Sequence, residues 1–398
     1  MDSYRRHPVR TLRPWILCVL TAVAACSRSE HTFVEVTEAG IPVARTTGGP
    51  LLTEPPFRLE REMVFGDPEQ GESAMLTSPR GYMEVPGGLA VLDGGSRSLK
   101  VYNNDGSLRF SLGRRGQGPG EFEDPDMDHS LAPDGRVLIT DGTNQRLTLV
   151  DPATGEFEII TMRDKHSFNA AQIATDRYLI HDPTLTPDFA QLESLLLVDR
   201  SFTVVDTFAA IPAGRVFRVS RGPGDDTPGI QVSQPFWPFF SWWVQADRIA
   251  ISQGKEFRVD LHASDGTLVR RVEWDAPLTA VDDSMWQAAY ERTREQYRDN
   301  APTVWSIFER PEHVPSMETV RLDDLGRIWA LRYIPSQRWG GPEDQTLYWD
   351  VVTPDGEWLG TQPFTGITRY FGNDVCYMTE SGEESSVVVR YRLVPAER

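Results

Sequence analysis

A segment that recurs about every 48 residues constrains the fold of this chain more than any other feature. Each copy has a turn residue followed by a short aliphatic run, and the clearest copies end in aspartate. Those copies are residues 87–93 and 134–141, and the segments that follow them, 98–102 and 146–150, are offset by 48. Weaker copies occur at residues 176–182, 247–252, 326–331 and 372–378. Repeats of about 40 to 50 residues, each holding four strands, indicate a β-propeller, so six copies predict six blades.

The turns and the chain ends support a closed ring. Asp-Gly pairs at 105–106, 265–266 and 355–356 separate alternating strands, as tight hairpin turns require. The last repeat offers only three strands, so we expect residues 57–65 to supply its fourth and remove a free sheet edge. The predicted fold class is all-β: residues 56–398 form a six-bladed β-propeller with four-stranded blades, closed by this N-terminal strand.

Two insertions interrupt the period. Residues 212–234 are rich in Gly, Pro and Asp and predict a long loop. Residues 282–298 predict a helix, since Ser284 with Gln287 forms a capping-box pattern and Trp286 lies on an apolar stripe with Tyr290.

The first 25 residues have the pattern of an export signal. Four arginines precede an apolar run at residues 15–25, which is too short to span a bilayer but fits a signal peptide. The run ends in Ala24-Ala25-Cys26, which resembles the lipobox of bacterial lipoproteins. That resemblance implies cleavage before Cys26 and its lipidation, and Ser27 favours the outer membrane over the inner. Residues 26–55 would then form a lipidated tether and a short hairpin. Cleavage at an Ala-x-Ala site and simple secretion is the alternative.

A Gly-rich linker carries a second resemblance. Residues 111–122, followed by Pro125 and by Pro133-Asp134-Gly135, resemble the linker of NHL-repeat propellers over about residues 81–158. The whole layout is similar to bacterial six-bladed β-propeller lipoproteins of the NHL-repeat-like type. The resemblance implies fold and export, and most such proteins have no assigned activity.

Charge and motifs exclude several functions. The chain has formal charge −18, and removal of the arginine-rich signal leaves it near −21, so the protein should repel nucleic acid. With Cys18 removed and Cys26 lipidated, Cys376 is left without a disulfide partner. The sequence contains no catalytic or nucleotide-binding motif that we recognise, so we predict no catalytic residue, metal or cofactor. We expect a monomer that contacts the membrane through its lipid.

Polar candidates for a site lie in blades two and three. Asp128 and His129 stand where an apolar inner strand is usual, so they either face the central channel or make turn contacts. His129, His166 and His181 could share a Zn²⁺ ion, although the sequence cannot show that they converge. The aspartates that end the repeats, such as Asp93 and Asp141, more often accept turn hydrogen bonds than hold Ca²⁺.

The aromatic and cationic candidates are few. Six aromatic residues lie within residues 236–243, more than one face of a strand can bury. They either offer a surface to a sugar, peptide or planar ligand or pack beneath the helical insertion. Arg114 and Arg115 either bind a carboxylate ligand or bridge to neighbouring acidic residues. The predicted ligand-binding residues are Arg114, Arg115, Asp128, His129, His181, Trp237, Phe239, Trp242 and Trp286.

Three functional hypotheses follow. The first is a non-catalytic binding scaffold at the envelope for a peptide, a glycan or a partner protein. The second is a metal-assisted lyase or lactone hydrolase with a site at the channel mouth. The third is a structural role in an envelope assembly. Fold alone does not choose among them, because propellers host many functions.

Overall fold

The computed structural model describes residues 30–127, 129, 131–162, 169–185, 190–219, 230–335, 346–382 and 385–396. The predicted signal peptide, Cys26, Asp128 and His166 lie outside these residues.

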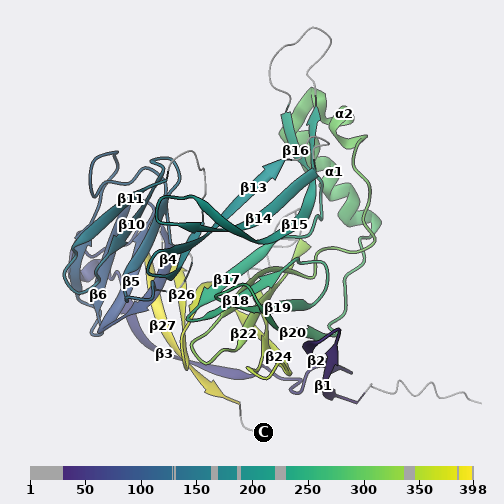
Figure 1. Ribbon diagram of the computed structural model, residues 1–398, viewed down its shortest axis with the longest axis horizontal. Helices are drawn as coiled ribbons and strands as arrows, with labels where there is room; N and C mark the ends of the chain where they lie inside the picture. Colours follow the sequence, from purple (N-terminus) through teal and green to yellow (C-terminus); the bar gives the residue numbers. More distant parts are fainter. Residues whose placement is uncertain are drawn as a thin grey trace, which may run out of the picture.

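The structure confirms a six-bladed β-propeller (Figure 1). Blade one holds β4 (Pro79–Val85), β5 (Gly88–Asp93), β6 (Ser98–Asn103) and β7 (Leu108–Leu112). Blade two holds β8 (Pro125–Asp126), β9 (Val137–Asp141), β10 (Arg146–Val150) and β11 (Phe157–Thr161). Blade three holds β12 (Ala170–Ala174), β13 (Arg177–Leu185), β14 (Ala190–Asp199), β15 (Val204–Val219) and the added β16 (Ile230–Ser233).

The remaining blades complete the ring. Blade four holds β17 (Ser241–Gln245), β18 (Arg248–Ser252), β19 (Arg258–Ala263) and β20 (Leu268–Trp274). Blade five holds β21 (Met317–Leu322), β22 (Ile328–Arg332), β23 (Leu347–Val352) and β24 (Trp358–Phe364). Blade six holds β25 (Ile367–Phe371), β26 (Val375–Ser381), β27 (Ser386–Pro395) and β3 (Phe57–Phe65). The first strand of each blade is innermost, and β21 contacts both β17 and β25 across blade boundaries.

The N-terminal strand closes the last blade, as predicted. β3 pairs antiparallel with β27, with Leu59 opposite Leu393 and Val64 opposite Val389. Phe65 is buried at one end of this strand and Phe57 at the other. Strand pairing and core packing therefore join the two ends of the described chain.

The aspartates of the repeat have a structural role. Asp93 Oδ1 accepts the Ser78 N–H at 2.7 Å, and Asp141 Oδ2 accepts the Glu123 N–H at 2.8 Å. Each carboxylate thus ties the end of a second strand to the segment that precedes the inner strand of its own blade. This confirms the turn-bonding interpretation of these aspartates and explains their recurrence.

Large aromatic side chains fill the space between blades. Trp329 of blade five stacks on Phe371 of blade six, with ring centroids 4.0 Å apart. Trp349 meets the same phenyl ring edge-on at 5.0 Å, and Phe57 lies 5.8 Å from Trp329. The hydrophobic core is therefore a series of layers between adjacent sheets, each closed by its neighbour.

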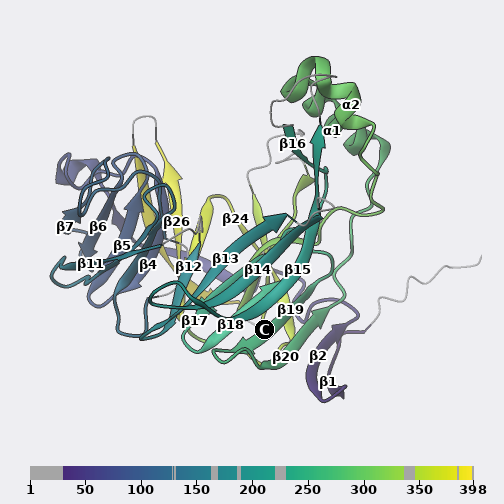
Figure 2. The same cartoon turned by 45° about the horizontal axis from the view of Figure 1, so that its top comes forward.

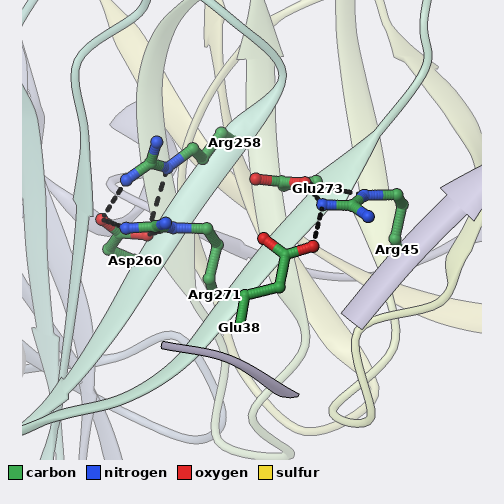
Figure 3. Close-up of polar contacts among 6 residues, drawn as sticks. All are labelled: Glu38, Arg45, Arg258, Asp260, Arg271 and Glu273. Atoms are coloured by element: carbon green, nitrogen blue, oxygen red, sulfur yellow. Dashed lines mark hydrogen bonds and ion pairs between the residues drawn. The ribbon is translucent and has the colours of Figure 1, made fainter. Parts of the chain in front are cut away.

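A hairpin before the closing strand widens blade four. β1 (Thr32–Glu38) and β2 (Ile41–Thr47) form the hairpin predicted around Gly40, and β2 continues the sheet by pairing parallel with β20. Arg45 bridges Glu38 and Glu273 at 3.0 and 2.8 Å (Figure 3). Val43 and Ala44 are buried, so packing as well as charge holds the hairpin to the propeller.

The helical insertion stands away from the blades together with the extended end of blade three (Figures 1 and 2). It comprises α1 (Asp283–Tyr297), a 3-10 turn (Arg298–Asn300) and α2 (Ala301–Trp305); a second 3-10 turn (Pro68–Gln70) precedes blade one. Val304 of α2 packs against Val232 of β16. We call α1, α2, residues 235–240 and the β15–β16 end the crown.

Two local predictions were wrong. The N-cap of α1 is Asp282, whose carboxylate accepts the Met285 N–H at 2.8 Å, rather than Ser284. Asp282 caps as well as serine and precedes it by two residues. Residues 212–234 are not all loop, because β15 continues to Val219 and β16 returns antiparallel to it.

Candidate functional site

The aromatic segment before β17 packs into the crown. Phe236 is buried with a positive φ of 57° and contacts the indole of Trp286, with centroids 6.4 Å apart. Phe239 stacks with Tyr333 at 5.9 Å, and Trp237 is half-buried. The insertion therefore covers part of this segment, as the packing alternative requires, while the predicted ligand-binding roles of Trp237, Phe239 and Trp286 remain predictions.

The helices of the crown form a pocket with an aromatic wall. Trp286 of α1 and Trp305 of α2 lie 4.5 Å apart, and Tyr290 meets Trp305 edge-on at 5.2 Å. All three rings are half-buried. They line a cavity of about 400 Å³ that is completed by Gln287, Pro302 and Ser306. We call this cavity the aromatic pocket.

No charged side chain lines the aromatic pocket among the described residues. The wall offers ring faces, one amide group and one hydroxyl group. These groups suit a neutral ligand that has an apolar face and a few hydrogen-bonding groups. They include no nucleophile paired with a base, and they cannot hold a metal ion.

A second cluster lies in the central channel around His129. Its imidazole contacts the indoles of Trp242 and Trp243, with centroids 4.0 and 5.4 Å away. The guanidinium of Arg321, from blade five, lies over Trp243 at 4.2 Å from the ring centroid. Among the described residues no group hydrogen-bonds to either ring nitrogen of His129.

The surroundings of His129 keep it neutral. Burial is the main cause and the charge of Arg321 the next, and together they lower the pKa of His129 to about 3. The pKa places the free imidazole, which could accept a proton or ligate a metal, inside the propeller. The sequence placed His129 correctly near the channel, but it gave no sign that Arg321 would approach from blade five.

His181 lies in the neighbouring blade and has its own partner. Its Nε2 contacts a carboxylate oxygen of Glu193 on the adjacent strand, and its ring faces Phe240 at 5.6 Å. No group of three or more side chains able to hold a metal ion occurs in the part of the chain that the structure describes. The zinc hypothesis thus keeps only His129 and His181 within view, since His166 lies outside the described residues.

The two linker arginines pair with acidic residues of their own linker. Arg114 contacts Glu121 at 2.7 Å, and Arg115 contacts Glu123 at 2.8 Å. Their side chains are 80% and 71% exposed, so these pairs add little stability. Their ligand-binding role remains a prediction.

A cavity of about 390 Å³ between blades three and four contains an aspartate that is already neutralised. Lining residues include Ala209, Arg258, Asp260 and His262. Although burial opposes it, hydrogen bonding to Arg271 and Arg258 holds the pKa of Asp260 below its ordinary value (Figure 3). This carboxylate is thus committed to the sheet.

Sequence reasoning missed Tyr290 as a site residue and did not place Trp305 in a pocket. Both were noted only as possible packing partners, because helix spacing shows which residues share a face but not what a second helix brings to it. No helix among the described residues is both long enough and apolar enough to cross a membrane.

Comparison with known proteins supports the fold. No family model matches the chain, and no curated protein matches it. A protein from Bacteroides fragilis, described as exported, superposes with a TM-score of 0.53 at 10% identity, covering 88% of this chain and 99% of its own. A member of the DUF4221 family from Bacteroides vulgatus gives 0.51 at 14% identity, covering 86% and 100%. At such identities the likeness concerns architecture alone, and by that architecture the chain is a six-bladed β-propeller.

Proposed function

We propose that this chain is an exported, lipid-anchored β-propeller that acts as a non-catalytic binding scaffold for a peptide, a glycan or a partner protein. The aromatic pocket of the crown carries the proposal. It combines two tryptophans and a tyrosine with one amide and one hydroxyl, and no charged side chain lines it in the described structure. The ligand would approach the face on which the inner strands begin.

Ring stacking is the physical basis of binding. Trp286, Tyr290 and Trp305 fix one another through mutual contacts, so a ligand orders few new side-chain rotors. The exposed Gln287 amide and Ser306 hydroxyl supply direction to a ligand that presents hydroxyl or amide groups. Pyranose faces and proline rings both fit this description, so glycans and proline-containing peptides are the first ligands to test.

The export and anchoring part of the proposal rests on the N-terminal pattern. Cys26 follows the apolar run of residues 15–25 directly, and the first described residue is Glu30. A tether this short would hold the propeller close to a membrane surface. We propose the periplasmic side of the outer membrane, because the residue after Cys26 is serine. A β-propeller described as exported shares the fold, which is consistent with this address.

A binding screen tests the function. Purified protein beginning at Glu30 is applied to glycan and peptide arrays, and hits are titrated by tryptophan fluorescence. We expect Tyr290→Ala and Trp305→Ala to weaken a hit by at least about tenfold, as for central aromatic anchors. The matched control is Tyr348→Ala, an exposed tyrosine on β23 outside the pocket. A hit that all three variants bind equally would place the site elsewhere.

Metal analysis separates the scaffold from the enzyme hypothesis. A stoichiometric divalent ion that survives dialysis, and whose removal by EDTA lowers the Tm, would contradict the non-catalytic scaffold and favour a lyase or lactone hydrolase. Anchoring is tested separately in cells. Palmitate labelling and membrane retention should both be lost in Cys26→Ser, whereas retention without label would contradict the lipid anchor.

A further inference from the structure

The channel has a second mouth, on the face where the inner strands end. A cavity of about 570 Å³ opens there, and every blade contributes to its wall. One residue from each of blades one to six is Glu84, Leu131, Gln172, Gln245, Asp324 and Tyr370. We call it the mouth cavity. It lies across the propeller from the crown, since residues 236–240 precede β17 whereas Gln245 ends it.

The polar groups of the mouth cavity are almost all acceptors. Carboxylates come from Glu84, Asp247 and Asp324, and no lysine, arginine or histidine is among the described residues that line it. Tyr377 donates to Glu84 Oε1 at 2.7 Å, which leaves the second oxygen of that carboxylate available. Apolar groups such as Val85, Leu131 and Ile173 make up much of the remaining wall.

Two buried amide oxygens point to a missing donor. Gln172 is only 6% exposed, and its Nε2 donates to the Thr175 carbonyl oxygen at 2.9 Å. A carbonyl can only accept, so this bond fixes the orientation of the amide. Gln172 Oε1 is then left without a hydrogen-bond donor in the described structure, and so is Gln245 Oε1, whose own Nε2 donates to Asp324. Buried acceptors of this kind cost stability unless a donor reaches them.

The electrostatics favour a positive ligand. Desolvation at the mouth, followed by the negative charges of Glu84 and Asp323, raises the pKa of the Asp324 carboxyl. The folded protein therefore holds carboxylates that repel one another beside acceptors that lack donors. A bound cation with N–H groups relieves both conditions at once.

We propose that the mouth cavity binds a small organic cation, a primary amine in its ammonium form that carries an apolar group. An ammonium has three donors and no acceptor, which matches the carboxylate and amide oxygens. The apolar wall would cover the carbon part of the ligand, and the volume is ordinary for a small-molecule site. A Ca²⁺ ion fits less well, because it requires about six to eight oxygen ligands, and the described residues contain no cluster of three metal-binding side chains.

Calorimetric titration tests the proposal. The probe is 2-phenylethylammonium, and its neutral counterpart of matching shape is 2-phenylethanol. We expect the ammonium to bind and the alcohol to bind at least about tenfold more weakly, as the loss of charge-assisted hydrogen bonds predicts. Equal binding of the two compounds, or no binding of the ammonium at millimolar concentration, would overturn the proposal. So would preferential binding of CaCl₂ or of a blocked lysine amide, because the proposed ligand is a free small amine.

Variants locate the site. Glu84→Gln and Asp324→Asn should each weaken the ammonium by about tenfold or more, and glutamine at 84 keeps an acceptor for the Tyr377 hydroxyl. The control is Asp355→Asn, which makes the same charge change in the β23–β24 turn outside the cavity. Thermal unfolding of each variant shows whether it is folded. Unchanged affinity in both folded site variants would overturn the assignment, whatever the result for the aromatic pocket.

Discussion

The imidazole of His129 lies against the indole of Trp242, with ring centroids 4.0 Å apart and planes inclined by 37°. The two residues come from blades two and four, so their contact crosses the channel. His129 is buried, and the low pKa of its imidazole, about 3, means that protonation is strongly disfavoured in the folded state. The channel is therefore closed at this level by a neutral ring.

This contact predicts a loss of stability in mild acid. An unfolded histidine has a pKa near 6.5, so between pH 6.5 and 3 the unfolded chain binds the extra proton. The contribution is complete above pH 6.5 and falls as the pH drops. At pH 5 the loss is about 2 kcal/mol. We expect the decrease in the free energy of unfolding from pH 7 to pH 5 to be smaller by this amount in His129→Phe than in the wild type.

Urea unfolding at the two pH values measures the effect. Each protein is compared with itself at pH 7, so a constant packing cost of the phenyl ring cancels. His313→Asn, at an exposed histidine, should behave as the wild type does. An equal decrease in wild type and His129→Phe would show that the buried imidazole does not resist protonation.

A buried ion pair in blade five should be far more important than its exposed neighbour. Asp323 is 1% exposed and accepts hydrogen bonds from Arg327 Nε at 2.5 Å and from Trp329 Nε1 at 2.8 Å. Asp323→Ala strands a buried guanidinium and an indole N–H, so we expect it to lower the free energy of unfolding by about 3–5 kcal/mol. Asp374→Ala, which removes a second, exposed carboxylate 4.0 Å from Arg327, should cost less than about 1 kcal/mol. Similar costs for the two substitutions would contradict this distinction.

The architecture could be predicted because its signals are local. Turn residues and aliphatic runs recur at each blade, and the aspartates that end the second strands make their bonds within a few tens of residues. The closing strand was predictable for a different reason. Blade six visibly lacked one strand, and residues 57–65 were an unassigned strand at the other end of the chain.

The sites were less predictable because they depend on contacts between blades. The pattern around Ser284 hid the better-placed cap Asp282, and Gly and Pro in residues 212–234 concealed the extension of blade three. The parallel pairing of β2 with β20 has no sequence signature, since both strands read as ordinary edges. Likewise, Gln172 and Asp324 lie far apart in sequence, and only ring closure brings them to one cavity.

The remaining thiol should be inert in the folded protein. Cys376 is fully buried, and burial raises the pKa of its thiol. The thiolate is the reactive form, so we expect Cys376 not to react with a thiol reagent at pH 8 until the chain unfolds. In protein beginning at Glu30, one thiol per chain should react in guanidinium chloride and none before. Rapid reaction under native conditions would mean that the β26 packing opens readily.

Deletions distinguish the two N-terminal elements. Removing residues 30–47 takes away the hairpin but leaves all six blades, so we expect cooperative unfolding with a Tm lower by about 5–10 °C. Removing residues 30–65 also deletes β3, which exposes the edge of β27 and removes Phe57 and Phe65 from the core. We expect this longer deletion to aggregate or to lose its cooperative transition.

A permuted chain separates strand loss from mere truncation. Phe57 lies opposite Pro395 in the antiparallel pair, so the start of β3 is adjacent to the end of β27. Residues 57–65 can therefore follow Arg398 through a short Gly-rich turn, in a chain that begins at Gly66. We expect the permuted chain to recover the cooperative transition seen in the hairpin deletion, as measured by calorimetry. If the chain lacking residues 30–65 already unfolds at the same Tm as that deletion, closure by β3 does not stabilise the ring.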